Sequence, residues 1–478
     1  MRMTRMMRWR SLAAAAVFVL MLWLPRDVRA FPVDGDQAAL PAGSELNEDA
    51  LLLPHEILKS EYRGDRVSYL VALGDIAFNS PAVLGDVARR AGISCGTCHV
   101  NGAGNAKLFV PGMSTRPGNF DTTGPLFNPR ADNHVLDPVR VPSLRGARFL
   151  APYGHDGRIA SLREFVRNVI VGEFAGPEPK PEILDAIVAY VREIDFLPNP
   201  KLGAAGRLNN LASEAEHRGE ALFAKPFPHD PKLSCAACHV PSGAFVDHQQ
   251  HDIGSGGLFK TPTLLNADFN APYFHDGRYD TFDQVVDHFN VVYGLGLSAQ
   301  DHGDLVAYLH AVGGAHQPYD TDGVVFRFQD ITTFSLLLSQ AIVAQDRDAI
   351  DLAVDTLGNE MRELAEHFPD QRDTTVKDAL IERRMARAAF KDAVISLRRV
   401  AMATDAGDFA AAAAEYRTYY ALTFSRAMPL ARGTEPWSLF NAALHDAHNA
   451  ERRRMLRAQV RASNAAPKDA PKAAEASR

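Results

Sequence analysis

The pentapeptides Cys95-Gly96-Thr97-Cys98-His99 and Cys235-Ala236-Ala237-Cys238-His239 decide the architecture of this chain and use all four of its cysteines. Two thiols one helical turn apart can add to the two vinyl groups of a haem, and the adjacent histidine can ligate the iron. A single Cys-x-x-Cys could be a redox dithiol or half of a zinc site, but two copies followed by histidine favour haem. We therefore predict two covalent haems c, with His99 and His239 as the proximal iron ligands.

Residues 1–30 have the pattern of an export signal. Four arginines lie in the first ten residues, Ser11–Leu24 form an apolar run, and Val28-Arg29-Ala30 ends the stretch with a small residue. This order is typical of a cleaved signal peptide. Because haem c is attached outside the cytoplasm, we expect a periplasmic protein. The apolar run is too short for a comfortable membrane span, so we expect no span after cleavage.

The chain without this signal is acidic. The full chain has a formal net charge of −7, and residues 1–30 carry six arginines and one aspartate, so their removal changes the charge from −7 to −12. A surface of this sign argues against nucleic acid as a partner and allows a basic protein partner.

An internal repeat follows the two haem motifs. The first copy contains Val141-Pro142-Ser143-Leu144 and Ala151–Arg158, and the second contains Thr261-Pro262-Thr263-Leu264 and Ala271–Arg278. An amphipathic helical pattern comes after each copy. These are the helices Ile183–Ile194 and Asp304–Val312. The repeat predicts two tandem cytochrome c domains, each with short helices and long loops around one haem.

Beyond residue 324 the sequence takes on long helical periods that suggest a bundle. The expected helices are Phe328–Ala344, Ala349–His367, Val376–Met402, Phe409–Met428 and Trp437–Val460. The sequence leaves open whether this half dimerises the protein, covers a haem edge or holds a partner. We predict a mainly α fold with a signal peptide at 1–30, an N-terminal segment at 31–59, cytochrome c domains at 60–200 and 208–316, a helical domain at 324–462 and a disordered tail at 463–478.

Residues 60–316 resemble the bacterial di-haem cytochrome c peroxidases and their MauG-like relatives. The matching segments are Leu73-Gly74, Phe78, Ser94-Cys95, Phe245-Val246-Asp247, His251–Gly254 and Lys260–Gly277. The resemblance implies that one haem transfers electrons while the other reduces hydrogen peroxide. It also implies a small cytochrome c or cupredoxin as the electron donor.

The resemblance directs attention to the distal ligand of each haem. Met113 lies fourteen residues after His99 and is the only methionine between the signal peptide and Met361, so it is a candidate distal ligand of the first haem. Packing of its thioether against the porphyrin is the alternative, and His134 is a further candidate. In the second repeat the relatives' ligand position is Phe289 here, which leaves an open iron or ligation by His288 or Tyr293.

Candidate catalytic residues also come from the resemblance. Relatives have a tryptophan between the haems where this chain has His155, which could be a relay or could hold a tight turn. Peroxide cleavage needs a group that moves a proton between the two oxygens. Glu173 is the best-placed carboxylate, a solvated surface role being the alternative, and His248 and His251 follow the second haem motif.

Two classes of function fit these patterns. The first is a periplasmic di-haem peroxidase-type oxidoreductase, which reduces hydrogen peroxide or oxidises a protein in the MauG-like manner. The second is a non-catalytic di-haem electron carrier that docks to a dehydrogenase or respiratory partner. The sequence favours the first, because Phe289 removes a ligand from one iron. The sequence does not decide whether a calcium ion lies between the domains or whether the protein forms a homodimer.

Overall fold

The computed structural model describes residues 40–41, 43–46, 53–64, 66–319, 321, 323–369, 379–448, 450 and 454. The predicted signal peptide at 1–30 and the tail at 463–478 lie outside these residues, as does part of the segment 31–59. The described chain is mainly helical and has two small two-stranded sheets, so the prediction of a mainly α fold is confirmed. None of its helices combines the length and apolar character that a membrane span needs.

The first repeat, which from here on means the region from Lys59 to Glu193, contains the first hydrophobic core. Its α-helices are α2 (Lys59–Tyr62), α3 (Tyr69–Phe78), α4 (Asp86–Ala91), α5 (Cys95–Cys98), α6 (Leu162–Arg167) and α7 (Pro181–Glu193). Its short elements are η3 (Pro81–Leu84), η4 (Val100–Gly102), η5 (Ala147–Phe149) and the π-helix η6 (Asn168–Glu173). Strands β1 (Asn119–Phe120) and β2 (Val139–Arg140) pair antiparallel. The rest of the repeat is loop.

The second repeat, which from here on means the region from Ala204 to Gly313, contains a separate hydrophobic core. Its α-helices are α8 (Glu214–Ala224), α9 (Cys235–Cys238), α10 (Phe282–Val292) and α11 (Ala299–Gly313). The short elements are η7 (Ala204–Gly206), η8 (Pro241–Gly243), η9 (Ala267–Phe269) and the antiparallel strands β3 (Gln250–Asp252) and β4 (Leu258–Lys260). Capping boxes at Ser213, Thr281 and Ser298 start α8, α10 and α11, because each cap side chain satisfies an otherwise free backbone N–H.

Both repeats use a glycine where their first and last long helices cross. A Cβ atom at Gly74 of α3 would lie 1.9 Å from the carbonyl oxygen of Ala186 in α7. In the second repeat, a Cβ at Gly219 of α8 would lie 2.0 Å from the carbonyl oxygen of Asp304 in α11. Only glycine permits such a close approach of two helix backbones. The paired crossing therefore supplies the frame on which each haem motif is mounted.

The helical half, residues 324–448, packs around a third core. Its elements are α12 (Val324–Ala344), α13 (Arg347–Glu366), α14 (Leu380–Asp405), α15 (Phe409–Ala421), the π-helix η10 (Leu422–Ala427), α16 (Met428–Thr434) and η11 (Glu435–Trp437). The expected helix from Trp437 instead starts after this 3₁₀ turn, and residues 442–448 are helical. Asn441 explains the later start, because its Oδ1 accepts from the backbone N–H of Ala443 at 3.1 Å and of Leu444 at 3.4 Å and so caps the helix there.

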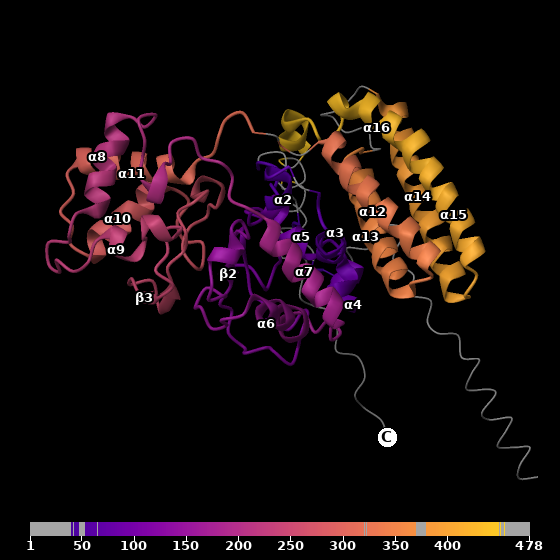
Figure 1. Cartoon of the computed structure of the whole chain (residues 1–478), viewed down its shortest axis with the longest axis horizontal. Coiled ribbons are helices and arrows are strands. Elements are labelled where there is room, and N and C mark those ends of the chain that lie inside the picture. Colours follow the sequence, from indigo (N-terminus) through magenta and orange to yellow (C-terminus); the bar gives the residue numbers. More distant parts are fainter. Residues whose placement is uncertain are drawn as a thin grey trace, which may run out of the picture.

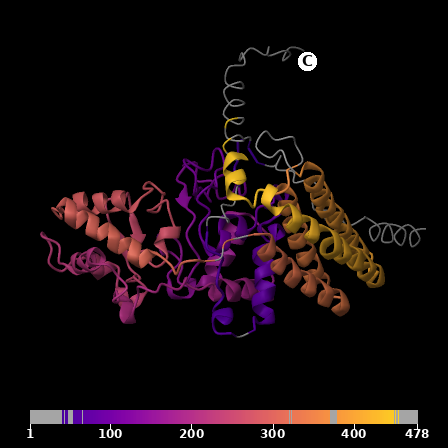
Figure 2. The ribbon, with the colours of Figure 1, turned by 90° about the horizontal axis from the view of Figure 1, so that it is seen from above.

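The first repeat lies between the second repeat and the helical half (Figures 1 and 2). Helices α12 and α13 pack on α3, and α13 also contacts η3. Ile76 of α3 is buried in the third core, while Leu352 of α13 packs against the first core. The helical half is therefore joined to the first repeat by shared apolar packing.

Asp355 of α13 stabilises the contact between the helical half and the first repeat. Its carboxylate is 4% exposed and accepts hydrogen bonds from Ser80 Oγ at 2.9 Å and from the backbone N–H of Ala82 at 2.9 Å. Arg89 Nε of α4 donates to the same carboxylate at 2.8 Å. A buried carboxylate with three such partners holds α13 in one position on the first repeat.

Replacing Asp355 by alanine should lower the stability of the whole protein against unfolding. The change leaves the largely buried Arg89 and Ser80 without their acceptor, and breaking a buried ion pair costs about 3–5 kcal/mol. We expect a lower midpoint of thermal unfolding. The matched control is Asp348→Ala on the same helix, since Asp348 pairs with Lys180 where both side chains are more than half exposed. Equal midpoints for the two variants would contradict the role of Asp355.

Candidate haem sites

Each Cys-x-x-Cys segment forms a single helical turn that ends at its histidine. Ser94 Oγ caps α5 by accepting from the backbone N–H of Thr97, and Ser234 Oγ caps α9 by accepting from Ala237. His99 and His239 follow as C-caps with non-helical backbone angles. The turn places its two thiols on one side of the helix, and none of the four cysteines forms a disulfide. This is the local geometry that covalent attachment of a haem requires.

Both proximal histidines are oriented by backbone carbonyls. The Nδ1–H of His99 donates to the carbonyl oxygen of Pro142 at 2.9 Å. His239 Nδ1 lies 3.2 Å from the carbonyl oxygen of Phe245. Such a contact fixes the tautomer and leaves Nε2 for the iron.

Burial keeps these two rings neutral. Desolvation lowers the pKa of His99 to about 4, with the nearby charge of Arg140 acting in the same direction. Desolvation also lowers the pKa of His239. A neutral imidazole is the form that ligates iron, so both histidines are prepared for that role at neutral pH.

Two buried cations between the repeats lack an anionic partner. Desolvation lowers the pKa of Arg140 to about 10 and that of Lys260 to about 8. Arg140 Nε is buried without a hydrogen-bond partner, and no carboxylate among the described residues pairs with either cation. Uncompensated buried charge is costly. Haem propionates are anionic groups that would supply the missing partners, so the residues present fit two haems c.

The first repeat buries Met113 in the same core as its thiols. Met113 is 3% exposed, and Cys95 and Cys98 pack against that core. His134, the other candidate, has a side chain that is 87% exposed and pairs with Asp132 at 3.0 Å. His134 is therefore held at the surface.

Glu173 lies at the end of the π-helix η6, and its side chain is 12% exposed. Arg158 Nη2 lies 3.1 Å from Glu173 Oε1, and Asn168 Nδ2 donates to the same oxygen at 3.3 Å. Burial raises the pKa of Glu173 above its ordinary value, while Arg158 and Thr122 act against the rise. A carboxyl group with a raised pKa takes up a proton more readily than a solvated one, which suits a group that moves protons.

In the second repeat, both ring nitrogens of His288 are engaged. Tyr279 Oη lies 3.0 Å from His288 Nδ1, and His288 Nε2 lies 2.7 Å from the carbonyl oxygen of Ile253. Ligation of an iron by His288 would require one of these bonds to break. Phe289 stacks parallel to Tyr293, with ring centroids 6.1 Å apart. Burial raises the pKa of Tyr293, and the charges of Cys238, Asp252 and Cys235 act in the same direction.

The remaining candidate histidines make structural hydrogen bonds. His155 Nε2 lies 2.6 Å from the carbonyl oxygen of Arg140, and desolvation lowers the pKa of His155 to about 4. His251 Nε2 lies 2.6 Å from Asp247 Oδ2. His248 Nδ1 lies 2.6 Å from the carbonyl oxygen of Ala151 in the first repeat. The latter contact joins the two repeats.

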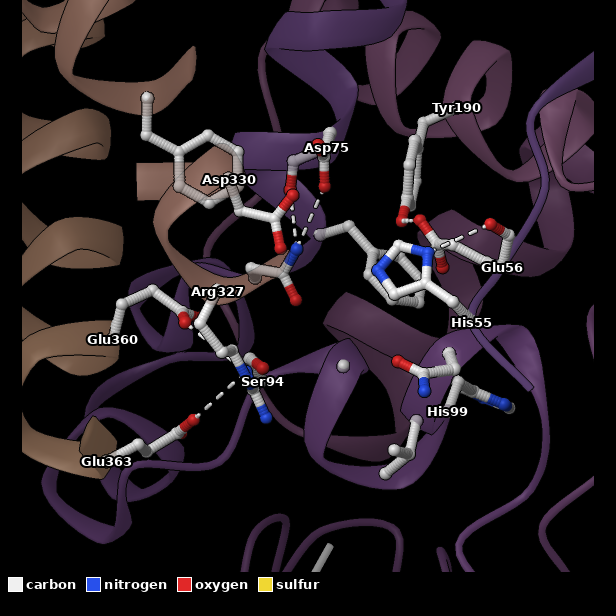
Figure 3. Close-up of a pocket in the computed structure, with 16 residues that line it drawn as sticks. His55, Glu56, Asp75, Ser94, His99, Tyr190, Arg327, Asp330, Glu360 and Glu363 are labelled. Carbon is white, nitrogen blue, oxygen red and sulfur yellow. Dashed lines mark hydrogen bonds and ion pairs between the residues drawn. The ribbon is translucent and has the colours of Figure 1, made fainter. Parts of the chain in front are cut away.

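A cavity of about 70 Å³ separates the first haem motif from the helical half (Figure 3). Its walls include Gly96 and His99 of the haem motif and Asp75 of α3. Desolvation and the neighbouring carboxylates of Asp330, Glu56 and Glu360 raise the pKa of Asp75 well above its ordinary value. The cavity therefore gathers proton-holding groups beside the proximal ligand.

The helical half contributes much of this wall, which the sequence did not reveal. Arg327 and Asp330 come from α12, and Glu360 and Glu363 come from α13 (Figure 3). Arg327 Nη1 lies 3.3 Å from Glu360 Oε2. In the sequence, carboxylates spaced along amphipathic helices resemble solvated surface residues. Only the packing of these helices on α3 shows that they line the cavity.

Comparison with known proteins supports this interpretation of the motifs. Residues 213–311 match the family model described as di-haem cytochrome c peroxidase. Hydrazine synthase subunit gamma of Kuenenia stuttgartiensis is 27% identical over 35% of this chain and 63% of its own length. Cytochrome c peroxidase Ccp of Escherichia coli is 26% identical over 53% of this chain and 60% of its own length. MauG of Methylorubrum extorquens is 26% identical over 46% of this chain and 68% of its own length.

The chain spans less than two thirds of the length of the first two of these relatives. The family model falls within the second repeat, where the second haem motif lies. The paired motifs, the carbonyl-bound histidines and the unpaired cations agree with haem c as the cofactor. On these grounds the haem-bearing part of this chain is similar to the di-haem cytochrome c peroxidases and MauG-like proteins.

Proposed function

We propose that this protein is a periplasmic peroxidase-type oxidoreductase that reduces hydrogen peroxide to water. Glu173 carries the proposal, because it is a largely buried carboxyl group with a raised pKa in the first repeat. Such a group is what O–O cleavage needs beside a haem. The proposed parts are cytochrome c domains at 60–200 and 208–316 and a helical domain at 324–462.

In the proposed reaction, hydrogen peroxide takes up two electrons and two protons and leaves as two water molecules. The bound haem supplies the electrons and the metal that polarises the O–O bond. Glu173 accepts the proton from one oxygen of hydrogen peroxide and returns it to the other, which departs as water. The ion pair with Arg158 keeps the Glu173 carboxyl in place between these two transfers.

The two haems have different distal sides in this proposal. Met113 is the displaceable distal ligand of the first haem, a role that its burial beside Cys95 and Cys98 supports. The second haem has no strong distal ligand, because both nitrogens of His288 are occupied and Phe289 offers no donor atom. Tyr293 is then the only candidate ligand that remains in the second repeat.

A small basic redox protein would dock on the second repeat. Residues 208–316 carry thirteen acidic and five basic side chains, a net charge of −8, whereas residues 60–200 carry fifteen of each. Asp283, Asp287 and Val291 follow one another at helical spacing on the exposed face of α10, and Val291 is 80% exposed. An acidic rim beside a small apolar contact suits a basic cytochrome c or cupredoxin donor.

A side-chain cation could replace a calcium ion between the repeats. Lys260 Nζ donates to the carbonyl oxygens of Leu150 at 2.7 Å and Pro152 at 2.6 Å. Converging carbonyl oxygens are ligands that calcium prefers. We therefore favour Lys260 as the bridging cation at this place over a calcium ion.

The distal ligands can be tested by electron paramagnetic resonance of the ferric holoprotein. We expect one low-spin and one high-spin haem, because Met113 completes the first iron while the second lacks a strong ligand. Met113→Leu should convert the low-spin signal to high spin, and Met361→Leu in the third core should leave it unchanged. Two low-spin haems in the native protein, or an unchanged spectrum in Met113→Leu, would argue against these assignments.

The role of Glu173 can be tested by substitution. Glu173→Gln removes the proton acceptor but keeps the shape, so the rate of peroxide reduction should fall by about 10²–10⁴-fold. The matched control is Glu178→Gln, since Glu178 is an exposed partner of Arg167. Steady-state turnover with a reduced basic cytochrome c measures both. Equal rates in Glu173→Gln and the native protein would exclude Glu173 as the proton carrier, and no peroxide turnover by the native protein would favour the non-catalytic electron carrier.

The docking face can be tested by charge reversal. Asp283→Lys with Asp287→Lys should lower kcat/KM for a reduced basic cytochrome c and weaken its dependence on ionic strength, because the acidic rim steers the encounter. The value of kcat at saturation should persist. Asp185→Lys on the first repeat is the control and should have little effect. An equal loss in the control would place the docking site elsewhere.

A further inference from the structure

Tyr190 of α7 lies between the proximal ligand of the first haem and the acidic wall of the cavity. Tyr190 is 2% exposed, and the centroid of its ring is 5.2 Å from that of Phe78. The Phe78 ring in turn lies 6.4 Å from the ring of His99. All three side chains line the cavity (Figure 3). One aromatic ring therefore separates the Tyr190 phenol from the imidazole that would ligate the iron.

The hydroxyl group of Tyr190 has a carboxylate as its hydrogen-bond acceptor. Tyr190 Oη donates to Glu56 Oε1 (Figure 3). The backbone holds Glu56 beside α7, because the N–H of Asp195, just beyond the end of that helix, donates to the carbonyl oxygen of Ile57 at 2.9 Å. A carboxylate can take over the proton of a hydrogen-bonded phenol, so Tyr190 has a base in direct contact.

The surroundings keep the proton on Tyr190 as long as the ring is not oxidised. Burial raises the pKa of Tyr190 well above its ordinary value, and the charges of Glu56, Asp75 and Asp330 act in the same direction. Negative charges near the ring also favour the removal of an electron from it, since they stabilise the positive charge that remains. An oxidised phenol is a strong acid, so its proton would pass to the hydrogen-bonded carboxylate.

Arg145 favours the ionised form of Glu56. The guanidinium is buried, and its Nη2 donates to the carbonyl oxygen of Pro54 at 2.7 Å, two residues before Glu56. Burial lowers the pKa of Arg145 to about 10, while the charge of Glu56 acts against this lowering. Because the attraction between opposite charges is mutual, the buried cation stabilises the Glu56 carboxylate. Glu56 is thereby able to accept a proton.

We propose that Tyr190 is a redox-active tyrosine, which gives one electron to the first haem after hydrogen peroxide has oxidised that haem. The phenolic O–H bond breaks: the electron goes to the haem held by His99, and the proton forms a new O–H bond on Glu56 Oε1. A neutral phenoxyl radical remains and holds one of the two oxidising equivalents of peroxide. An electron from the donor protein and the return of the proton restore the phenol. The inference rests on the proposed function, because peroxide is the oxidant.

The second repeat has the same aromatic arrangement without the carboxylate. Tyr308 of α11 is the equivalent of Tyr190, and its ring lies 4.9 Å from that of Phe223. The Phe223 ring lies 6.2 Å from that of His239. In the part of the chain that the structure describes, no hydrogen bond joins the Tyr308 hydroxyl to a carboxylate. Tyr308→Phe is therefore a matched control for Tyr190→Phe.

Among the described side chains, one other tyrosine donates to a base. His288 Nε2 lies 2.7 Å from the carbonyl oxygen of Ile253, so this nitrogen carries the proton and Nδ1 accepts. Tyr279 Oη lies 3.0 Å from that Nδ1. This pair belongs to the second repeat, whereas Glu173 belongs to the first. Tyr279 is therefore the competing site that the test must separate from Tyr190.

Electron paramagnetic resonance of the full-length ferric holoprotein, frozen immediately after addition of hydrogen peroxide, tests the inference. We expect a tyrosyl radical in the native protein and in Tyr308→Phe, and its loss in Tyr190→Phe. Glu56→Gln should also lose the radical, because a neutral amide accepts the hydrogen bond but does not take up the proton. Visible spectra of the same samples check that every variant binds two haems.

Three outcomes would overturn the inference. They are the absence of a radical in a native protein that reduces peroxide, an undiminished radical in Tyr190→Phe, and loss of the radical in Tyr308→Phe or Tyr279→Phe. If Tyr190→Phe does not bind haem, an undiminished radical in Glu56→Gln overturns the inference instead.

Steady-state reduction of peroxide separates this inference from the proposed function. Turnover without a radical contradicts the role of Tyr190 alone. A radical without turnover contradicts the proposed function alone, and the absence of both contradicts both.

Discussion

The hydrogen bond from each proximal histidine to a backbone carbonyl constrains the rest of the haem region. It fixes His99 on Pro142 and leaves the other ring nitrogen facing the space for a haem. The proline segment must then lie beside the haem motif, and the interface between the repeats forms where these segments continue. The close crossings at Gly74 and Gly219 bring the flanking helices near enough to hold each motif in that position.

Desolvated charged or titratable groups lie on two sides of the first haem motif. Arg140 and Lys260 are cations on the interface side, and desolvation by burial lowers the pKa of both. On the side of the helical half, Asp75 is a buried carboxyl with a raised pKa among other acids. In a medium of low dielectric, charges of both signs would influence the redox potential of an iron held by His99.

Sequence patterns predicted what depends on local chemistry. The two haem motifs, the repeated Pro142 and Pro262 segments and the mainly α fold follow from spacing and periodicity. They could not predict contacts between residues far apart in the chain. Asp355 looks like a surface residue of an amphipathic helix, yet it binds Ser80, which lies 275 positions away. The occupation of both nitrogens of His288 was equally hidden, because Ile253 and Tyr279 approach it only in the folded protein.

The repeats share a backbone but differ in the side chains placed on it. Gly154 has a φ of +91°, and its equivalent in the second repeat, Phe274, keeps a φ of +71°. A left-handed conformation costs a non-glycine residue about 1–2 kcal/mol. Packing of the Phe274 ring against His288 at 4.7 Å and Phe289 at 5.9 Å offsets that cost. An aromatic ring thus packs beside His288 and Phe289 in the second repeat, whereas the first repeat has Gly154 at the equivalent position and a largely buried carboxyl group in Glu173. The two repeats therefore surround their haem motifs with side chains of different chemistry.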